Sequence, residues 1–134
     1  MTEPRFTDRE LDVMDVLWRR RSAKVADVQE DLEDELAYTT VLTVLQTLEE
    51  KGHVRHEQEG RAYRYHPTVD REEAGSSAVS YMLRKIFRDS PRLLLSQLVS
   101  DRDLSEEDLR ELRSLLDERL TGNEGQAEPP EGDV

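Results

Sequence analysis

The sequence predicts a mainly α-helical chain with one small β-hairpin, followed by a second helical region. Three observations predict this class. Apolar residues recur at helical spacing in three segments before residue 52, two alternating segments flank Gly60, and apolar helical stripes return after Pro67. The order helix, helix, helix, hairpin is that of a winged helix-turn-helix, in which the hairpin is the wing.

A capping box marks the start of the first helix. Thr7 is the expected N-cap, Glu10 occupies the third helical position, and Phe6 is placed to pack against Leu11. The basic run 19–21 is expected to end this helix. Apolar residues at helical spacing form its expected buried stripe: Leu11, Met14, Leu17 and Trp18.

Two further helices and a hairpin are expected next. Helical spacing predicts a second helix over Val25–Leu36 and a third over Tyr38–Lys51. Alternation then predicts strands over 53–57 and 62–66, joined by a turn at 58–61. The expected apolar members of the hairpin are Val54, Tyr63 and Tyr65.

The region after Pro67 carries helical stripes that are too apolar to stand in water alone, and a second capping box at 105–108 opens its last helix. Since no further layer of the chain covers these stripes, we expect a second copy to cover them. The sequence therefore predicts a winged helix-turn-helix domain at 1–69, a helical dimerisation domain at 70–121 and a disordered acidic tail at 122–134. The expected dimerisation residues are Val79, Met82, Leu83, Ile86, Phe87, Leu94, Leu98, Leu109, Leu112 and Leu116.

Composition limits the function classes. The 134 residues include no cysteine, which excludes disulfides, thiolate nucleophiles and cysteine-based metal sites. No catalytic constellation is recognisable, so we expect neither an enzyme nor a cofactor. A metal site at His53, His56 and His66 is disfavoured, because residues 53 and 56 would point to opposite faces of a strand. Without a leader or an apolar run of about 18 residues, a cytoplasmic chain without membrane insertion is expected.

The net charge of −12 stands at first sight against nucleic-acid binding, because phosphate neutralisation supplies most non-specific affinity. Net charge sums over all faces, however, and a DNA-binding protein needs only one positive surface. Acids gather at 30–35 and in the tail from residue 122, whereas 51–65 carries four Lys and Arg against two Glu. The charge also supports a second hypothesis: a winged-helix interaction adaptor without specific DNA binding.

The outward face of the third helix is the segment most typical of a DNA-binding surface. Exposed helix positions elsewhere carry Asp, Glu and Arg, but here they are short, polar and uncharged until Glu49. Threonine hydroxyls can contact phosphates, threonine methyls can contact thymine, and a glutamine can pair with adenine. The alternative is a β-branched face packed on another protein segment. The residues of this face are Thr39, Thr40, Thr43, Gln46 and Thr47.

Basic side chains near the hairpin complete the predicted interface. Arg61 and Arg64 lie at and just after the expected tip, where a wing would meet the DNA backbone or the minor groove. Lys51 and Arg55 are further candidates for phosphate contacts. For each of these residues the alternative is a solvated charge that contacts no ligand.

Four segments carry a family resemblance: ELDVMDVLW, VADVQEDL, AYTTVLTVLQTLEEKGHV and the wing GRAYRYHP. Together, over Phe6–Leu120, they resemble the penicillinase-repressor (BlaI/MecI) family of winged-helix regulators. The resemblance implies a homodimeric repressor that binds a palindromic double-stranded DNA operator, with a membrane-bound sensor peptidase as upstream partner. It also places Tyr38, Thr39, Thr40 and Thr43 in the recognition helix and Gly60-Arg61 in the wing.

Three departures from the family pattern bear on contacts and regulation. Members often carry an arginine in the segment that is TLEEKG at 47–52 here. Antibiotic-responsive members are released by cleavage at an Asn-Phe bond, and the similar stretch at 98–103 has none. Copper-responsive relatives bind metal through a cysteine motif, which this chain lacks. The sequence therefore leaves open the operator, the regulated genes, the inducing signal and any link to β-lactam resistance.

Overall fold

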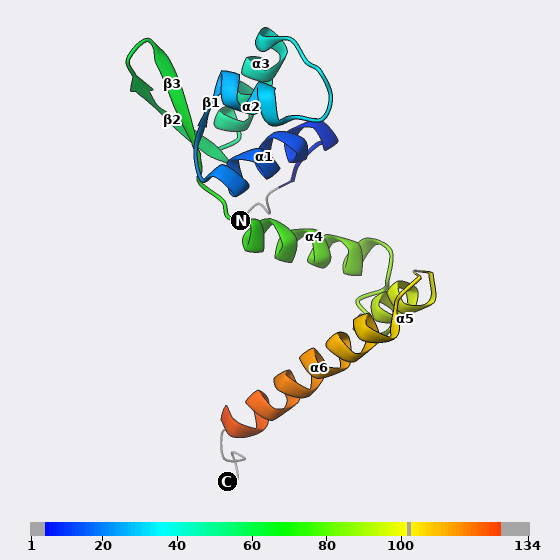
Figure 1. Cartoon of the computed structure of the whole chain (residues 1–134). Coiled ribbons are helices and arrows are strands. Elements are labelled where there is room, and N and C mark those ends of the chain that lie inside the picture. The colour runs from blue at the N-terminus through cyan, green and yellow to red at the C-terminus, as the bar shows by residue number, and fades with distance from the viewer. Residues whose placement is uncertain (1–4, 102, 127–134) are drawn as a thin grey trace. The chain divides into compact units, whose positions relative to one another are not determined.

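The computed structural model describes residues 5–101 and 103–126, and it divides into two compact units, one ending at Arg88 and the other beginning at Asp89. The predicted winged helix-turn-helix order is confirmed, with a small antiparallel sheet added to three helices (Figure 1). The elements are α1 (Asp8–Arg20), β1 (Ala23–Lys24), α2 (Val25–Asp31), α3 (Tyr38–Glu50), β2 (Val54–Glu59), β3 (Ala62–Pro67), α4 (Arg71–Lys85), α5 (Pro91–Asp101) and α6 (Glu106–Gln126).

The core of the first unit lies where α1, α2 and α3 meet the sheet. Its fully buried members include Met14, Leu17, Leu45 and Leu48 from the helices and Tyr65 from β3. Burying one such side chain stabilises the fold by about 1.5–3 kcal/mol, so packing at this junction fixes the orientation of α3.

The start of α1 follows the sequence prediction, while its buried face differs from it. The capping box is confirmed: Glu10 N–H donates to Thr7 Oγ1 at 3.2 Å, and Thr7 N–H donates to Glu10 Oε1 at 2.8 Å. Leu11, which we expected in the buried stripe, is 42% exposed. Val13 and Val16 are buried instead, so the buried face is rotated from the expected one.

The second helix is shorter than predicted. It ends at Asp31 rather than Leu36, because Leu32 already adopts an extended backbone with ψ of 142°. The three consecutive acids at 33–35 follow outside the helix. Leu36 still packs against the core, and its carbonyl accepts a hydrogen bond from Gln29 Nε2 at 2.9 Å.

The sheet has the strand order β1-β3-β2, with both pairings antiparallel. Strand β1 was not expected, because two residues are too short to show alternation. Glu59 pairs with Ala62, which leaves Gly60 and Arg61 as the turn, and Gly60 has a φ of 65° that suits glycine. We expected Tyr63 among the apolar members of the hairpin, but it lies outside the core. It is 45% exposed, and its ring packs on the His56 ring with 4.4 Å between ring centroids.

Helix α4 belongs to the first compact unit, which ends at Arg88. Its first residue, Arg71, donates to Asp15 Oδ1 of α1 at 2.9 Å and lies over the Trp18 ring at 4.9 Å. A capping box at Asp70 and Glu73 starts the helix.

The second unit contains α5 and α6, and the capping box expected before α6 is present. Ser105 N–H donates to Asp108 Oδ2 at 3.1 Å, and Asp108 N–H donates to Ser105 Oγ at 3.0 Å. Helix α6 continues past the expected end at residue 121 to Gln126. The rest of the expected tail, 127–134, lies outside the described residues.

None of the expected dimerisation residues is buried within the chain. Exposure is highest for Ile86, at 64%, and Leu116, at 52%. In the part of the chain that the structure describes, no helix is long and apolar enough to cross a membrane.

Candidate nucleic-acid interface

Helix α3 separates a buried apolar face from an exposed polar face. Val41, Leu45 and Leu48 are fully buried against the core. The opposite face carries no charge before Glu49, and its position is set by the buried one because both belong to one rigid helix. Thr47 is half-buried at the edge of this face. We call the exposed residues Tyr38, Thr39, Thr40, Thr43 and Gln46 the reading face.

The N-terminus of α3 differs from those of the other helices in the first unit. The first turns of α1, α2 and α4 each carry at least one acid, whereas the first turn of α3 carries none. Its N-cap, Ala37, offers no side-chain acceptor to the backbone N–H groups. A helix start of this kind presents amide donors and a partial positive charge, which favours an anion such as a phosphate.

Thr43 is the one threonine of the reading face whose described contacts fix its hydroxyl. Its Oγ1 donates to the Thr39 carbonyl at 2.9 Å, one turn back along the helix. The hydroxyl hydrogen is therefore used within α3, and the side chain presents a methyl group and oxygen lone pairs outward. This suits contact with a thymine methyl better than donation to a phosphate.

Lys51, predicted to contact phosphate, is paired within the protein. Its Nζ donates to both carboxylate oxygens of Glu10, at 3.0 and 2.9 Å. The Glu10 side chain is only 4% exposed. Burial raises the pKa of Glu10, but the hydrogen bond from Thr7 N–H and the Lys51 ammonium outweigh it and hold that pKa below its ordinary value.

The two predicted wing arginines have different surroundings. Arg64 donates to the Glu59 carboxylate, with the shortest contact at 3.0 Å, and to Ser22 Oγ at 3.2 Å. Lys24 also pairs with Glu59, at 3.2 Å. Hydrogen bonds from Arg64 and then Lys24 hold the pKa of Glu59 below its ordinary value. Arg61, beside the turn glycine, is exposed and has no ion-pair partner among residues 5–101 and 103–126.

The three histidines do not form one cluster. His56 Nδ1 lies 2.8 Å from both carboxylate oxygens of Glu49 at the end of α3. His66 Nε2 lies 2.9 Å from Glu57 Oε1 on the neighbouring strand. His53 packs against the Phe6 ring, and burial, followed by the nearby Lys51 charge, lowers the pKa of His53. Within the described ranges no group of three or more His, Cys, Asp or Glu is placed to hold a metal ion.

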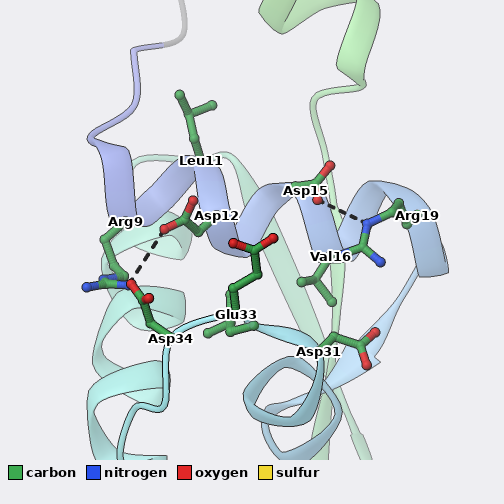
Figure 2. Close-up of a pocket in the computed structure, with 10 residues that line it drawn as sticks. Arg9, Leu11, Asp12, Asp15, Val16, Arg19, Asp31, Glu33 and Asp34 are labelled. Atoms are coloured by element: carbon green, nitrogen blue, oxygen red, sulfur yellow. Dashed lines mark hydrogen bonds and ion pairs between the residues drawn. The ribbon is translucent and has the colours of Figure 1, made fainter.

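Acidic side chains line a hollow between α1 and the segment 31–34 (Figure 2). Arg9 pairs there with Asp34 at 3.0 Å, and Arg19 pairs with Asp15 at 3.0 Å. No lining residue of this hollow belongs to α3 or to the wing. Part of the acid behind the net charge of −12 therefore lies apart from the reading face.

Comparison with known proteins gives a match over most of the chain. The profile of the Penicillinase repressor family matches residues 6–118. The chain belongs to the penicillinase repressor family. This family consists of transcriptional repressors and not of enzymes, so the prediction that the chain is not an enzyme is confirmed.

Relatives within the penicillinase repressor family are similar at different levels. The penicillinase repressor of Bacillus licheniformis is 27% identical over 117 residues, covering 86% of this chain and 91% of that one. The transcriptional regulator BlaI of Mycobacterium tuberculosis is 46% identical over 72 residues, covering 52% of each chain. The solution structure of the DNA-binding domain of the repressor BlaI is 32% identical, with a TM-score of 0.48, and covers 54% of this chain and 90% of that one.

Sequence reasoning placed the reading face but missed the pairing of two cations. The structure brings Tyr38, Thr39, Thr40, Thr43 and Gln46 together on one exposed face, as the helical spacing implied. It does not leave Lys51 and Arg64 free, because Glu10 and Glu59 occupy them. Glu10 was recognisable as a capping residue, but its approach to a lysine 41 residues away depends on tertiary packing.

Proposed function

We propose that this member of the penicillinase repressor family is a homodimeric DNA-binding repressor that recognises a palindromic operator. The reading face of α3 enters the major groove, and Arg61 at the wing tip contacts the DNA backbone. The observation that carries the proposal is the exposed, uncharged polar face of α3, whereas the exposed residues of α1 are mostly Asp and Arg.

Dimerisation is supported by the apolar residues left without cover just after α4 and in α5 and α6. Ile86, Leu98 and Leu116 are 64%, 41% and 52% exposed. Burial of such apolar side chains against a second copy would remove them from water and stabilise the dimer. Two reading faces would then meet successive major grooves about 34 Å apart, which is why the expected operator is palindromic. The location that follows from a DNA target is the cytoplasm.

The competing function is a protein-interaction adaptor, which the net charge of −12 favours. The two functions differ in what the reading face does. Gln46→Ala removes an exposed side chain that points away from the core, so a repressor loses operator affinity while an adaptor keeps its weak, non-specific DNA binding. Glu30→Ala, at an exposed position of α2, is the matched control.

The test is fluorescence anisotropy with double-stranded DNA from upstream of the gene for this chain and a scrambled duplex of equal length. Tight binding to the first duplex alone, weakened by Gln46→Ala about tenfold and unchanged by Glu30→Ala, supports the repressor. Equal weak binding to both duplexes at every salt concentration supports the adaptor. Sedimentation equilibrium tests dimerisation, because it measures whether the mass in solution is that of one chain, 15.6 kDa, or twice that value.

An upstream membrane-bound sensor peptidase is part of the proposal through the family resemblance alone. If release from DNA is proteolytic, cells that lift repression contain two fragments of the chain. Intact-mass analysis of the chain isolated before and after derepression distinguishes this from release of the uncut protein.

A further inference from the structure

Residues 51–53 form the junction between α3 and β2, and they connect the reading face to the wing. Helix α3 ends at Glu50 and β2 begins at Val54, so three residues carry the chain from one to the other. Gly52 adopts a φ of 85°, which reverses the chain direction here. Any contact that fixes this junction therefore fixes the placement of the reading face relative to the wing.

The junction is held from two sides by segments distant in sequence. Lys51 Nζ donates to Glu10 of α1, and the His53 ring packs at an angle of 47° on the Phe6 ring, with 4.7 Å between ring centroids. From the segment after β3, Thr68 N–H donates to the His53 carbonyl at 2.9 Å, and Thr68 Oγ1 donates to the Gly52 carbonyl at 2.6 Å. Phe6, just before α1, and Glu10, in its first turn, thus supply one half of these contacts.

The burial of Glu10 sets what Lys51 can do. A carboxylate that is 4% exposed needs a charged partner, because an uncompensated buried charge is strongly destabilising. If the Lys51 ammonium moved to a phosphate, Glu10 would keep only the Thr7 N–H donor on one of its oxygens. Two of the three N–H donors of the Lys51 ammonium already point to Glu10, so a phosphate would compete with the buried carboxylate for this charge.

Arg55 and Arg61 differ from Lys51 in this respect. Both are exposed, and neither has an ion-pair partner in the described part of the chain. Contact with a phosphate would break no internal interaction of either side chain. Both follow the junction, on β2 and at the turn of the wing.

We infer that Lys51 is a positioning residue, which through Glu10 fixes the junction between the reading face and the wing, and that Arg55 and Arg61 make the phosphate contacts. The inference rests on the proposed DNA-binding function, and it assigns one role to Lys51 and another to Arg55 and Arg61. A positioning residue affects affinity without contributing a released counterion, whereas a phosphate contact contributes about 0.9 to the slope of log affinity against log salt.

The decisive variant is the double substitution Glu10→Gln with Lys51→Met. It removes one negative and one positive charge, so the net charge of the chain stays at −12. Glutamine keeps an oxygen that accepts the Thr7 N–H hydrogen bond, and methionine keeps the apolar stem of the lysine. No buried charge is left without a partner, and any change in the salt slope then reports a lost phosphate contact of Lys51.

Affinity is measured by anisotropy over a salt series, with the upstream duplex and the scrambled duplex. The double variant is expected to bind the upstream duplex about threefold to tenfold more weakly at every salt concentration, with the slope unchanged. Arg61→Gln is expected to lower the slope by about 0.9. The single variant Lys51→Arg, which keeps a cation for Glu10, is expected to bind the upstream duplex with near-normal affinity.

A second readout needs no DNA. Amide hydrogen exchange of the free protein should be faster in the double variant at Gly52 and His53, whose N–H groups donate to the carbonyls of Glu49 and Leu48. A slope lowered by about 0.9 in the double variant overturns the inference, as does unchanged affinity together with unchanged exchange. If the wild-type protein does not prefer the upstream duplex, the proposed function fails, and the exchange experiment still decides whether Glu10 and Lys51 hold the junction.

Discussion

The first unit and the region beyond it differ in how they bury apolar side chains. All thirteen buried hydrophobic residues of the core cluster, from Val13 to Val69, precede α4. In α4, α5 and α6 the described residues include no buried apolar side chain, although leucines are frequent there. The interior of the first unit thus lies in the part before α4, and the described residues of α4, α5 and α6 bury no apolar side chain within the single chain.

The largest expected effect tests the core side of this comparison. Leu45→Ala removes a fully buried side chain of α3 and should lower the free energy of unfolding by about 2–5 kcal/mol. Leu11→Ala, at a position that is 42% exposed in the same unit, should cost clearly less. Urea denaturation of both variants measures the difference, and equal losses would contradict the assigned interior.

The next effect concerns the uncovered helices. Leu116→Glu places a charge on a side chain that is 52% exposed in the single chain, so the folded monomer should tolerate it. Dimer affinity should fall about tenfold to a hundredfold, because a leucine buried between copies contributes about 1.5–3 kcal/mol. Sedimentation equilibrium measures this, with exposed Glu118→Gln as the control. An unchanged dimer would mean that this face of α6 is not the interface.

A smaller effect is the pH dependence that Glu10 gives the first unit. Its pKa is lowered in the folded protein, so its stabilising contribution is fully present above the ordinary value of 4.5. That contribution is lost as the pH falls from 4.5 through the lower folded pKa, where the native state must also take up a proton. Urea midpoints across this range should fall less steeply for Glu10→Gln than for the wild type. Parallel curves would show that the carboxylate does not contribute.

The smallest effect lies on the surface of α6. Arg110 pairs with Glu106 at 2.6 Å, but the two side chains are 74% and 77% exposed. Solvent screens such a pair, so Arg110→Ala should change the free energy of unfolding by less than about 0.5 kcal/mol. A larger loss in the free energy of unfolding, measured by urea denaturation, would indicate that Arg110 makes a contact that the single chain lacks.

Local signals predicted most of the fold because they act over a few residues. The capping box at Thr7 and Glu10, the helical spacing of α3 and the alternation beside Gly60 each fix one element. Strand β1 was missed because its two residues are extended only through pairing with β3. The early end of α2 was missed because apolar spacing continued to Leu36, which packs on the core without being helical.

The candidate site was predictable on its polar helix face and less so in its charges. Burial of Val41 and Leu45 follows from spacing, and it determines that Thr40 and Thr43 face outward. The pairing of Lys51 with Glu10 and of Arg64 with Glu59 and Ser22 depends on how distant segments pack. A count of basic residues along the chain carries no information about which of them are already neutralised.

Trp18 gives this protein a built-in optical reporter. It is the only tryptophan of the chain, its indole N–H donates to the Val69 carbonyl at 2.8 Å, and the Arg71 guanidinium lies over its ring. Indole emission is sensitive to a hydrogen-bonding partner and to a nearby cation, and here they come from Val69, between β3 and α4, and from Arg71, the first residue of α4. A shift in emission wavelength or intensity during a DNA titration would therefore signal, without any attached label, that this segment moves.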